Sequence, residues 1–325
     1  MSALANVTVH SSQFPETVRR DLLNSLRARK IAHKFHYDSV KQTQKWLALH
    51  QQYSPSRHDD GCRAIYEQSF KAAAAQIKSR QVHLIGLGCG GGQKDTRLLK
   101  LLKAAGREIF YTPSDVAVAM VLTARRTALA VCPEKDCFPL VCDLETANDV
   151  PAVFTAPAAR RAARIITFFG MIPNFEPALI LPKLASLVRP KDILLFSANL
   201  APGENYDAGV KKILPQYDNA PTRDWLMTFL FDLGIEKNDG ELSFEIETKG
   251  GLKRIVANFK FKRARRIEIE NEHFDFKGGQ KIRLFFSYRY TPERICKLLA
   301  SHKLEVCEQW ITGSEEEGVL LCRRI

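Results

Sequence analysis

The chain has 325 residues, of which 45% are hydrophobic, and it carries a formal net charge of +12. The length allows two domains with a large core, and the composition excludes an intrinsically disordered chain. No apolar run is long enough to span a membrane, so membrane-spanning classes are excluded as well. The positive charge admits an anionic partner, such as RNA or a phosphorylated substrate, although basic surface residues also serve solubility.

The first residues and the cysteines indicate the compartment. Residues 1–6 have neither a basic start nor a long apolar run, so we expect no signal peptide. The cysteines are spread thinly, and Cys132, Cys137 and Cys142 are too far apart for a paired zinc site. We therefore expect a cytoplasmic protein with reduced cysteines and no metal ligands.

Residues 14–80 have the pattern of a helical cap. Apolar residues recur at helical spacing over 18–29 and 64–80, which predicts two amphipathic helices. Between them, Tyr37 and Tyr53 lie in polar, turn-rich surroundings. There the two tyrosines either line a pocket or are ordinary half-buried aromatic residues.

Strands and helices alternate from residue 81 to residue 200. This alternation predicts a parallel sheet with helices on both faces. The predicted strands end at Leu87, Asp115, Asp143, Phe169 and Asn199. Right-handed crossovers bring such ends to one edge of the sheet, and ligands bind there where the strand order reverses. We therefore expect Gly88, Asp115, Asp143 and Asn174 at one edge.

The first of these strands runs into a glycine-rich turn over residues 86–92. Glycines permit positive φ and the close approach of a ligand, and the following helix offers free N–H groups in its first turn. The spacing is neither that of a dinucleotide fingerprint nor that of a phosphate loop, so a nucleotide hydrolase is not expected. Asp115, which ends the next strand, can accept both ribose hydroxyls of a nucleoside.

The pattern changes after residue 200. Residues 206–234 read as helical, and alternating strands follow at 242–247, 254–261 and 266–270 with Gly-Gly turns between strands. They predict an antiparallel insertion. A helix over 291–301 and strands near 306–310 and 319–323 would complete the first sheet. The acidic run 315–317 is typical of a solvated turn.

The glycine turn, the acid that ends the second strand and the predicted seven-stranded sheet resemble the class I S-adenosylmethionine-dependent methyltransferases. A narrower resemblance rests on the order of several segments along nearly the whole chain. These segments are residues 35–38, 53–57, 87–90 with Lys94, 111–115, 169–175 and 217–218. In this order they resemble the histidine Nα-methyltransferase family of ergothioneine biosynthesis.

The resemblance implies a Rossmann-like α/β methyltransferase domain over 62–200, completed by 289–325. It implies a second α+β substrate domain built from 1–61 and the insertion 201–288. It also implies S-adenosylmethionine as cofactor. The implied cofactor contacts are Gly86, Gly88, Gly90, Lys94, Asp115 and Asp143.

The implied catalytic residues are Asn174 and Tyr37, and the implied substrate contacts are Tyr53, Trp225, Phe285 and Ser287. The chain departs from the family pattern in several places. Gly86 stands where the family has an acid, Phe285 stands where it has a glutamate that would grip an imidazole, and the segment before Asn174 is one residue shorter. We therefore predict an N-methyltransferase for an amino acid or related small amine other than histidine.

Two other functions remain as alternatives. The first is an RNA-binding protein or RNA methyltransferase, in which cations over 253–266 and the rings of Phe259 and Phe261 bind a single strand. An edge strand made soluble by charge is the simpler interpretation of that cluster. The second is a subunit that kept the fold but lost catalysis, which the changes at Gly86 and Phe285 suggest. The oligomeric state cannot be read from the sequence.

Overall fold

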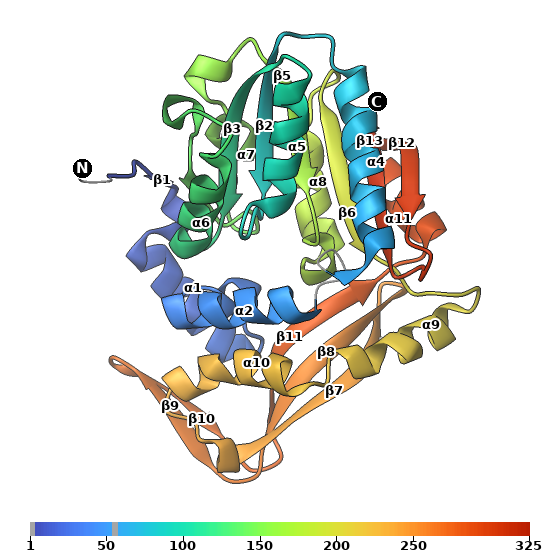
Figure 1. The fold of residues 1–325 in the computed structure, drawn as a ribbon. Coiled ribbons are helices and arrows are strands. Elements are labelled where there is room, and N and C mark those ends of the chain that lie inside the picture. The colour runs from blue at the N-terminus through green and yellow to red at the C-terminus, as the bar shows by residue number, and fades with distance from the viewer. Residues whose placement is uncertain (1–3, 54–57) are drawn as a thin grey trace. The chain divides into compact units, whose positions relative to one another are not determined.

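The computed structural model describes residues 4–53 and 58–325 (Figure 1). Contacts between residues divide these into two compact units. Unit 1 contains the described residues of 1–13, 55–200 and 291–325, and unit 2 those of 14–54 and 201–290. The functional domain boundaries expected after residues 61, 200 and 288 stay a prediction. None of the described helices is both long and apolar enough to cross a bilayer.

Unit 1 is built on an eight-stranded sheet. Its order is β1 (Thr8–Val9), β4 (Leu140–Val141), β3 (Glu108–Asp115), β2 (Gln81–Leu87), β5 (Ala163–Phe168), β6 (Ile193–Asn199), β13 (Glu317–Arg324) and β12 (Leu304–Ile311). The first six strands are parallel, and β13 is antiparallel to both its neighbours. The expected Rossmann-like α/β fold is confirmed. The expected number of seven strands is wrong, because β1 adds a two-residue strand too short to show alternation.

The helices of unit 1 connect these strands. They are α4 (Asp60–Gln76), α5 (Gln93–Ala104), α6 (Val118–Ala128), α7 (Val150–Val153), α8 (Pro177–Leu187) and α11 (Pro292–Ala300). Short 3-10 helices lie at η1 (Ser11–Gln13), η3 (Glu134–Asp136), η4 (Pro157–Ala159) and η5 (Ile172–Asn174). Helix α4 begins earlier than expected because Asp59 caps it. The Asp59 carboxylate accepts a hydrogen bond from the N–H of Gly61 at 2.7 Å.

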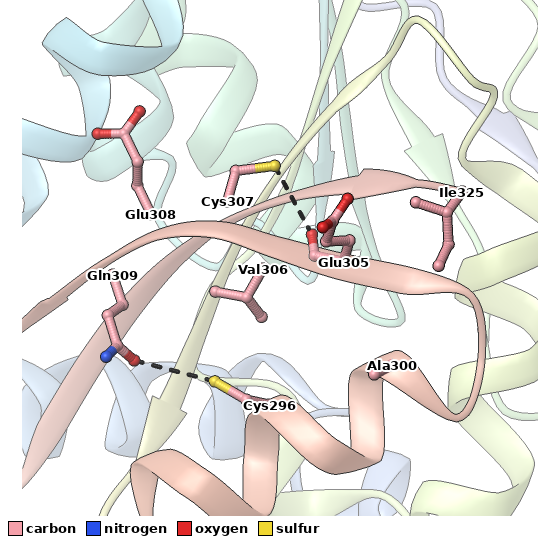
Figure 2. A pocket seen from close by; sticks show the side chains of 8 residues that line it. All are labelled: Cys296, Ala300, Glu305, Val306, Cys307, Glu308, Gln309 and Ile325. Carbon is pink, nitrogen blue, oxygen red and sulfur yellow. Dashed lines mark hydrogen bonds between the residues drawn. The ribbon is translucent and has the colours of Figure 1, made fainter.

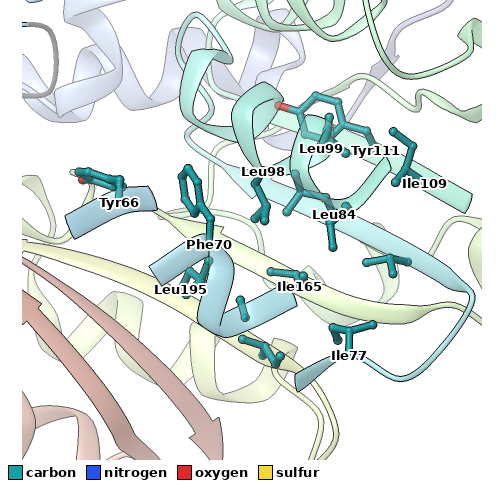
Figure 3. Close-up of a cluster of buried hydrophobic side chains, with 14 of the residues drawn as sticks. Tyr66, Phe70, Ile77, Leu84, Leu98, Leu99, Ile109, Tyr111, Ile165 and Leu195 are labelled. Atoms are coloured by element: carbon teal, nitrogen blue, oxygen red, sulfur yellow. The ribbon is translucent and has the colours of Figure 1, made fainter. Parts of the chain in front are cut away.

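The central strands of unit 1 are buried, with helices packed on both faces of the sheet. Strands β2, β5 and β6 are buried at successive positions, as expected of parallel strands covered on both faces. Figure 3 shows Phe70 of α4 and Leu98 of α5 packed with Leu84, Ile165 and Leu195 of the sheet. All five are 0% exposed. This packing holds in place the strands whose carboxyl ends carry the candidate site.

Unit 2 combines helices with two antiparallel sheets. Its helices are α1 (Pro15–Ala28), η2 (His33–His36), α2 (Val40–Tyr53), α9 (Tyr206–Ile213), η6 (Leu214–Gln216), α10 (Ala220–Asp232) and η7 (Lys237–Asp239). One sheet has the order β11 (Lys281–Arg289), β8 (Leu252–Phe261), β7 (Gly240–Lys249), and the other pairs β10 (Glu272–Phe276) with β9 (Arg265–Ile269). The antiparallel insertion is therefore present as expected.

Two local expectations for unit 2 are wrong. The region before Tyr53 is not turn-rich but forms helix α2, whose polar sequence hides the helical period. The helical stretch expected over 206–234 is broken in two. Asn219 starts the second helix, α10, because its side chain accepts a hydrogen bond from the N–H of Thr222 at 2.9 Å.

Candidate active site

The glycine turn after β2 requires its glycines. Gly88, Gly90 and Gly92 have φ values of 62°, 52° and 74°, a region that side chains other than glycine rarely adopt. A Cβ on Gly88 would also overlap the Met171 sulfur and lie 2.8 Å from the Met171 Cγ. The N–H of Cys89 donates to the carbonyl of Ser114 at 2.9 Å, which ties the turn to β3. The turn is thus a bare stretch of backbone held against the next strand.

Asp115 brings a half-buried carboxylate to this turn. Its Oδ2 accepts a hydrogen bond from the N–H of Gly90 at 3.0 Å, and its Oδ1 accepts one from the N–H of Ala117 at 3.2 Å. Burial raises the pKa of the Asp115 carboxyl to about 6, while hydrogen bonds from main-chain N–H groups oppose the shift. A carboxylate has further lone pairs, so it can still accept hydroxyl groups of a ligand.

The turn lies where the strand order of the sheet reverses. Strand β2 pairs with β3 on one side and with β5 on the other, so the connections that leave these strands diverge. Asp143 follows β4, where its Oδ1 accepts a hydrogen bond from the N–H of Glu145 at 2.9 Å. Asn174 ends η5, which follows β5. The predicted residues Gly88, Asp115, Asp143 and Asn174 therefore all lie at or after the carboxyl ends of parallel strands.

Lys94, in the first turn of α5, belongs to a polar network that the sequence did not reveal. Its Nζ donates to the hydroxyl of Tyr66 at 2.7 Å and lies 4.0 Å from the centroid of that ring. The Tyr66 hydroxyl donates in turn to the carboxylate of Glu317, and Lys94 Nζ lies 3.8 Å from the same carboxylate. Burial, followed by Glu317, raises the pKa of Tyr66 well above its usual value. Tyr66 therefore stays a hydrogen-bond donor.

Glu317 corrects one expectation from the sequence. The run 315–317 was interpreted as a solvated turn, but Glu317 begins β13 and its side chain is only 12% exposed. It pairs with Asn199 at the carboxyl end of β6. No local pattern indicates this position, because Tyr66 and Glu317 are 251 residues apart.

The predicted catalytic residue Tyr37 and the predicted substrate contacts Trp225 and Phe285 gather in an aromatic cluster of unit 2. The ring centroids of Tyr37 and Trp225 are 5.6 Å apart, and those of Trp225 and Phe285 are 5.9 Å apart. The indole N–H of Trp225 donates to the carbonyl of His36 at 2.9 Å, which fixes the orientation of the ring. Tyr53 is 48% exposed at the last position of α2. Residues 54–57, which belong to the same segment of the family resemblance, lie outside the described residues.

A β-bulge aims Phe285 into this cluster. The pairing of β11 with β8 shifts between Arg283 and Phe285, so that Leu284 is an extra residue. The Leu284 carbonyl lies 2.6 Å from Nε2 of His36 instead of joining the ladder. Burial lowers the pKa of His36 to about 4, so this imidazole is neutral at physiological pH. The cluster around Phe285 is therefore built of uncharged rings.

Ser287 lies at a polar end of the same cluster. Its Oγ is 2.8 Å from the hydroxyl of Tyr217, and Nη2 of Arg289 donates to that hydroxyl at 2.8 Å. The Tyr217 ring lies 6.1 Å from that of Phe285. Arg289 was not expected from the sequence, and alternation along β11, two residues beyond Ser287, is the signal that could have indicated it.

Residues 18–324 match the family described as histidine-specific, S-adenosylmethionine-dependent methyltransferases. The chain belongs to this methyltransferase family. The resemblance expected from the sequence is therefore confirmed. The general enzyme class and the cofactor S-adenosylmethionine are also confirmed at the level of the family.

Individual relatives of this methyltransferase are distant. The chain is 24% identical over 245 residues to N-methyltransferase imqF of Aspergillus flavus, and the match covers 72% of this chain and 65% of that relative. It thus spans less than two thirds of that relative's length. A solved S-adenosylmethionine-dependent methyltransferase from Clostridium acetobutylicum is similar with a TM-score of 0.47 and 11% identity, over 86% of this chain and 98% of that one. CalS10, an amino pentose methyltransferase from Micromonospora echinaspora, is similar with a TM-score of 0.39 and 15% identity, over 86% and 96%.

The aromatic part of the RNA-binding alternative is wrong for this methyltransferase. Phe259 and Phe261 are each 1% exposed, so they cannot stack on bases. Several cations of the basic cluster are paired with acids. Arg254 binds Glu247, Arg263 and Arg265 bind Asp239, and Arg266 binds Asp275. Several cations of the cluster are thus members of ion pairs, and the two phenylalanine rings among them are buried.

A hollow of about 520 Å³ lies elsewhere in unit 1, beside α11 and β12 (Figure 2). Its lining includes the thiols of Cys296 and Cys307, and burial raises the pKa of both. Neither thiol is activated, and the lining includes none of the predicted site residues. All eight cysteines of the chain are free.

Proposed function

We propose that this chain transfers a methyl group from S-adenosylmethionine to the nitrogen of an amino acid or related small amine other than histidine. The observation that carries the proposal is the bare glycine turn of β2 with the Asp115 carboxylate against it. A nucleoside can place its ribose hydroxyls on that carboxylate and its remaining groups against the backbone of the turn.

Methyl transfer from a sulfonium needs alignment more than activation. The lone pair of the amine forms the new N–C bond as the C–S bond breaks, and S-adenosylhomocysteine leaves as a neutral thioether. Holding nucleophile and methyl in line can supply roughly 7–11 kcal/mol. The amine must arrive without its extra proton. A neutral amide such as that of Asn174 can hold it without favouring the ammonium form.

The aromatic cluster of unit 2 supports the choice of substrate class. The ring of Tyr37 is only partly buried, so it can offer a face that stabilises a methylated cation by about 0.5–2 kcal/mol, while Trp225 and Phe285 are buried in the same cluster. Phe285 replaces the carboxylate that the resemblance implies for imidazole recognition, which favours an apolar or aromatic side chain. Nitrogen as the acceptor atom agrees with the relative N-methyltransferase imqF. A carboxylate on the substrate would suit the guanidinium of Arg289 beside Tyr217 and Ser287.

The decisive experiment incubates purified protein with S-adenosylmethionine and a panel of amino acids and small amines. Mass spectrometry then detects gains of one or more methyl groups. We expect at least one amine other than histidine to be methylated, and Asp115→Asn to reduce the yield. If the protein neither binds the cofactor nor methylates any member of the panel, the proposal fails. Cofactor binding without turnover would instead support the inactive-subunit alternative.

A further inference from the structure

Asp95, the third residue of α5, places a buried carboxylate beneath the glycine turn. It is 3% exposed. The Tyr111 hydroxyl donates to its Oδ2 at 2.7 Å, and the Thr167 hydroxyl donates to its Oδ1 at 2.8 Å. Tyr111 belongs to β3 and Thr167 to β5, the two strands that flank β2. One side chain therefore ties α5 to both neighbours of the strand that carries the turn.

Gly86 makes room for this carboxylate. A Cβ on Gly86 would overlap Oδ2 of Asp95 and lie 3.1 Å from its Cγ. Gly86 is not among the residues with positive φ, so its backbone would accept a side chain. The constraint is packing alone. A side chain at position 86 and the carboxylate of Asp95 compete for the same space, two residues before Gly88.

We propose that Asp95 is a positioning residue of the cofactor site: its carboxylate enters from α5 through the space left by Gly86 and holds the glycine turn in its ligand-binding conformation. The proposal rests on the function proposed above, in which S-adenosylmethionine binds at this turn. It explains how a chain without an acid at position 86 keeps a negative charge under the turn. The charge comes from the helix instead of the strand.

The electrostatics of the site add a pH dependence. Burial raises the pKa of Asp95 to about 6, and hydrogen bonds from Tyr111 and Thr167, with the charge of Lys94, oppose this shift. Cys89 and Tyr111 also face Asp95, and their raised pKa values keep both neutral. A cationic cofactor favours an ionised Asp95, so binding should strengthen as the pH rises through about 6. Asp115 titrates in the same range.

The test measures S-adenosylmethionine binding by isothermal titration calorimetry across this pH range in the parent protein and in variants of it. Asp95→Asn keeps the shape but loses the charge, and we expect about tenfold weaker binding with a shallower pH dependence, from Asp115 alone. Gly86→Ala adds a methyl group against the carboxylate and should also weaken binding. The double variant Gly86→Asp with Asp95→Gly returns the acid to the strand and should recover most of the affinity.

Circular dichroism and thermal unfolding show whether each variant is folded, and Tyr111→Phe serves as a milder variant that keeps the carboxylate and removes one hydrogen bond. Unchanged affinity and unchanged pH dependence in Asp95→Asn would overturn the inference while leaving the proposed function intact. A double variant that binds no better than the single variants would overturn it as well. If the parent protein binds no cofactor at any pH, both the proposed function and this inference fall.

Discussion

The carboxylate of Asp115 and the main-chain N–H of Gly90 are joined by a hydrogen bond of 3.0 Å across the ends of two neighbouring strands. This bond places an acid with a raised pKa of about 6 directly on the glycine turn. Because this half-buried acid lies directly on the turn, changes in its protonation should be visible in ligand binding.

We expect the affinity for S-adenosylmethionine to fall as the pH is lowered through about 6. Ribose hydroxyls donate to an ionised carboxylate, so the ligand favours the charged form of Asp115, which is present above its pKa and lost below it. Asp115→Asn should bind about tenfold more weakly at neutral pH, the size of one lost charge-assisted hydrogen bond. Calorimetric titrations at several pH values measure both effects. Equal affinity of the parent and Asp115→Asn would contradict the role of this residue.

Gly88→Ala should abolish most cofactor binding. Gly106 is its matched control, because it also has a positive φ, of 75°, but a Cβ there would meet nothing within 4 Å. Both substitutions should lower the free energy of unfolding by about 1–2 kcal/mol through backbone strain. Only Gly88→Ala pushes a methyl group against Met171 and the turn. Urea unfolding together with cofactor titration separates the two effects, and similar binding losses in both variants would refute the prediction.

Lys94→Met should weaken cofactor binding by about tenfold because it removes the ammonium of a predicted cofactor contact, whereas Lys100→Met, on an exposed position of the same helix, should not. Tyr66→Phe keeps the ring under Lys94 and removes the hydroxyl that joins it to Glu317. We expect its effect on affinity to be smaller than that of Lys94→Met. Binding titrations of the three variants measure this order, and a Lys100→Met effect equal to that of Lys94→Met would disprove it.

Phe285→Glu should change which amines are methylated. A carboxylate in the aromatic cluster can pair with an imidazole. Methylation of histidine should therefore increase relative to methylation of the best apolar substrate of the parent protein. Phe285→Leu removes the ring without adding charge and is the matched control. Competition assays with two amines in one reaction, read by mass spectrometry, give the ratio directly. The same ratio in the glutamate and leucine variants would show that charge at this position does not select the substrate.

The sequence by itself determined the fold class and the glycine turn with the acid beside it. The glycines over 86–92 can be recognised in the sequence because the turn needs backbone angles that favour glycine. Asp115 can be recognised because it is a polar residue at the end of a buried strand. The alternation of strands and helices is equally local. The two-residue strand β1 and the polar helix α2 were not predicted because neither has a clear period of hydrophobic residues.

Only the tertiary structure decided which distant side chains meet. Asp95 has the sequence signature of an ordinary acid in the first turn of a helix, yet it fills the space beside Gly86. Lys94 of α5 and Glu317 of β13, which are far apart in the sequence, are brought to the same tyrosine. Phe259 and Phe261 turn inward although cations surround them in sequence. In each case packing between elements far apart in the chain decides the outcome, and such packing leaves no pattern within any short stretch of residues.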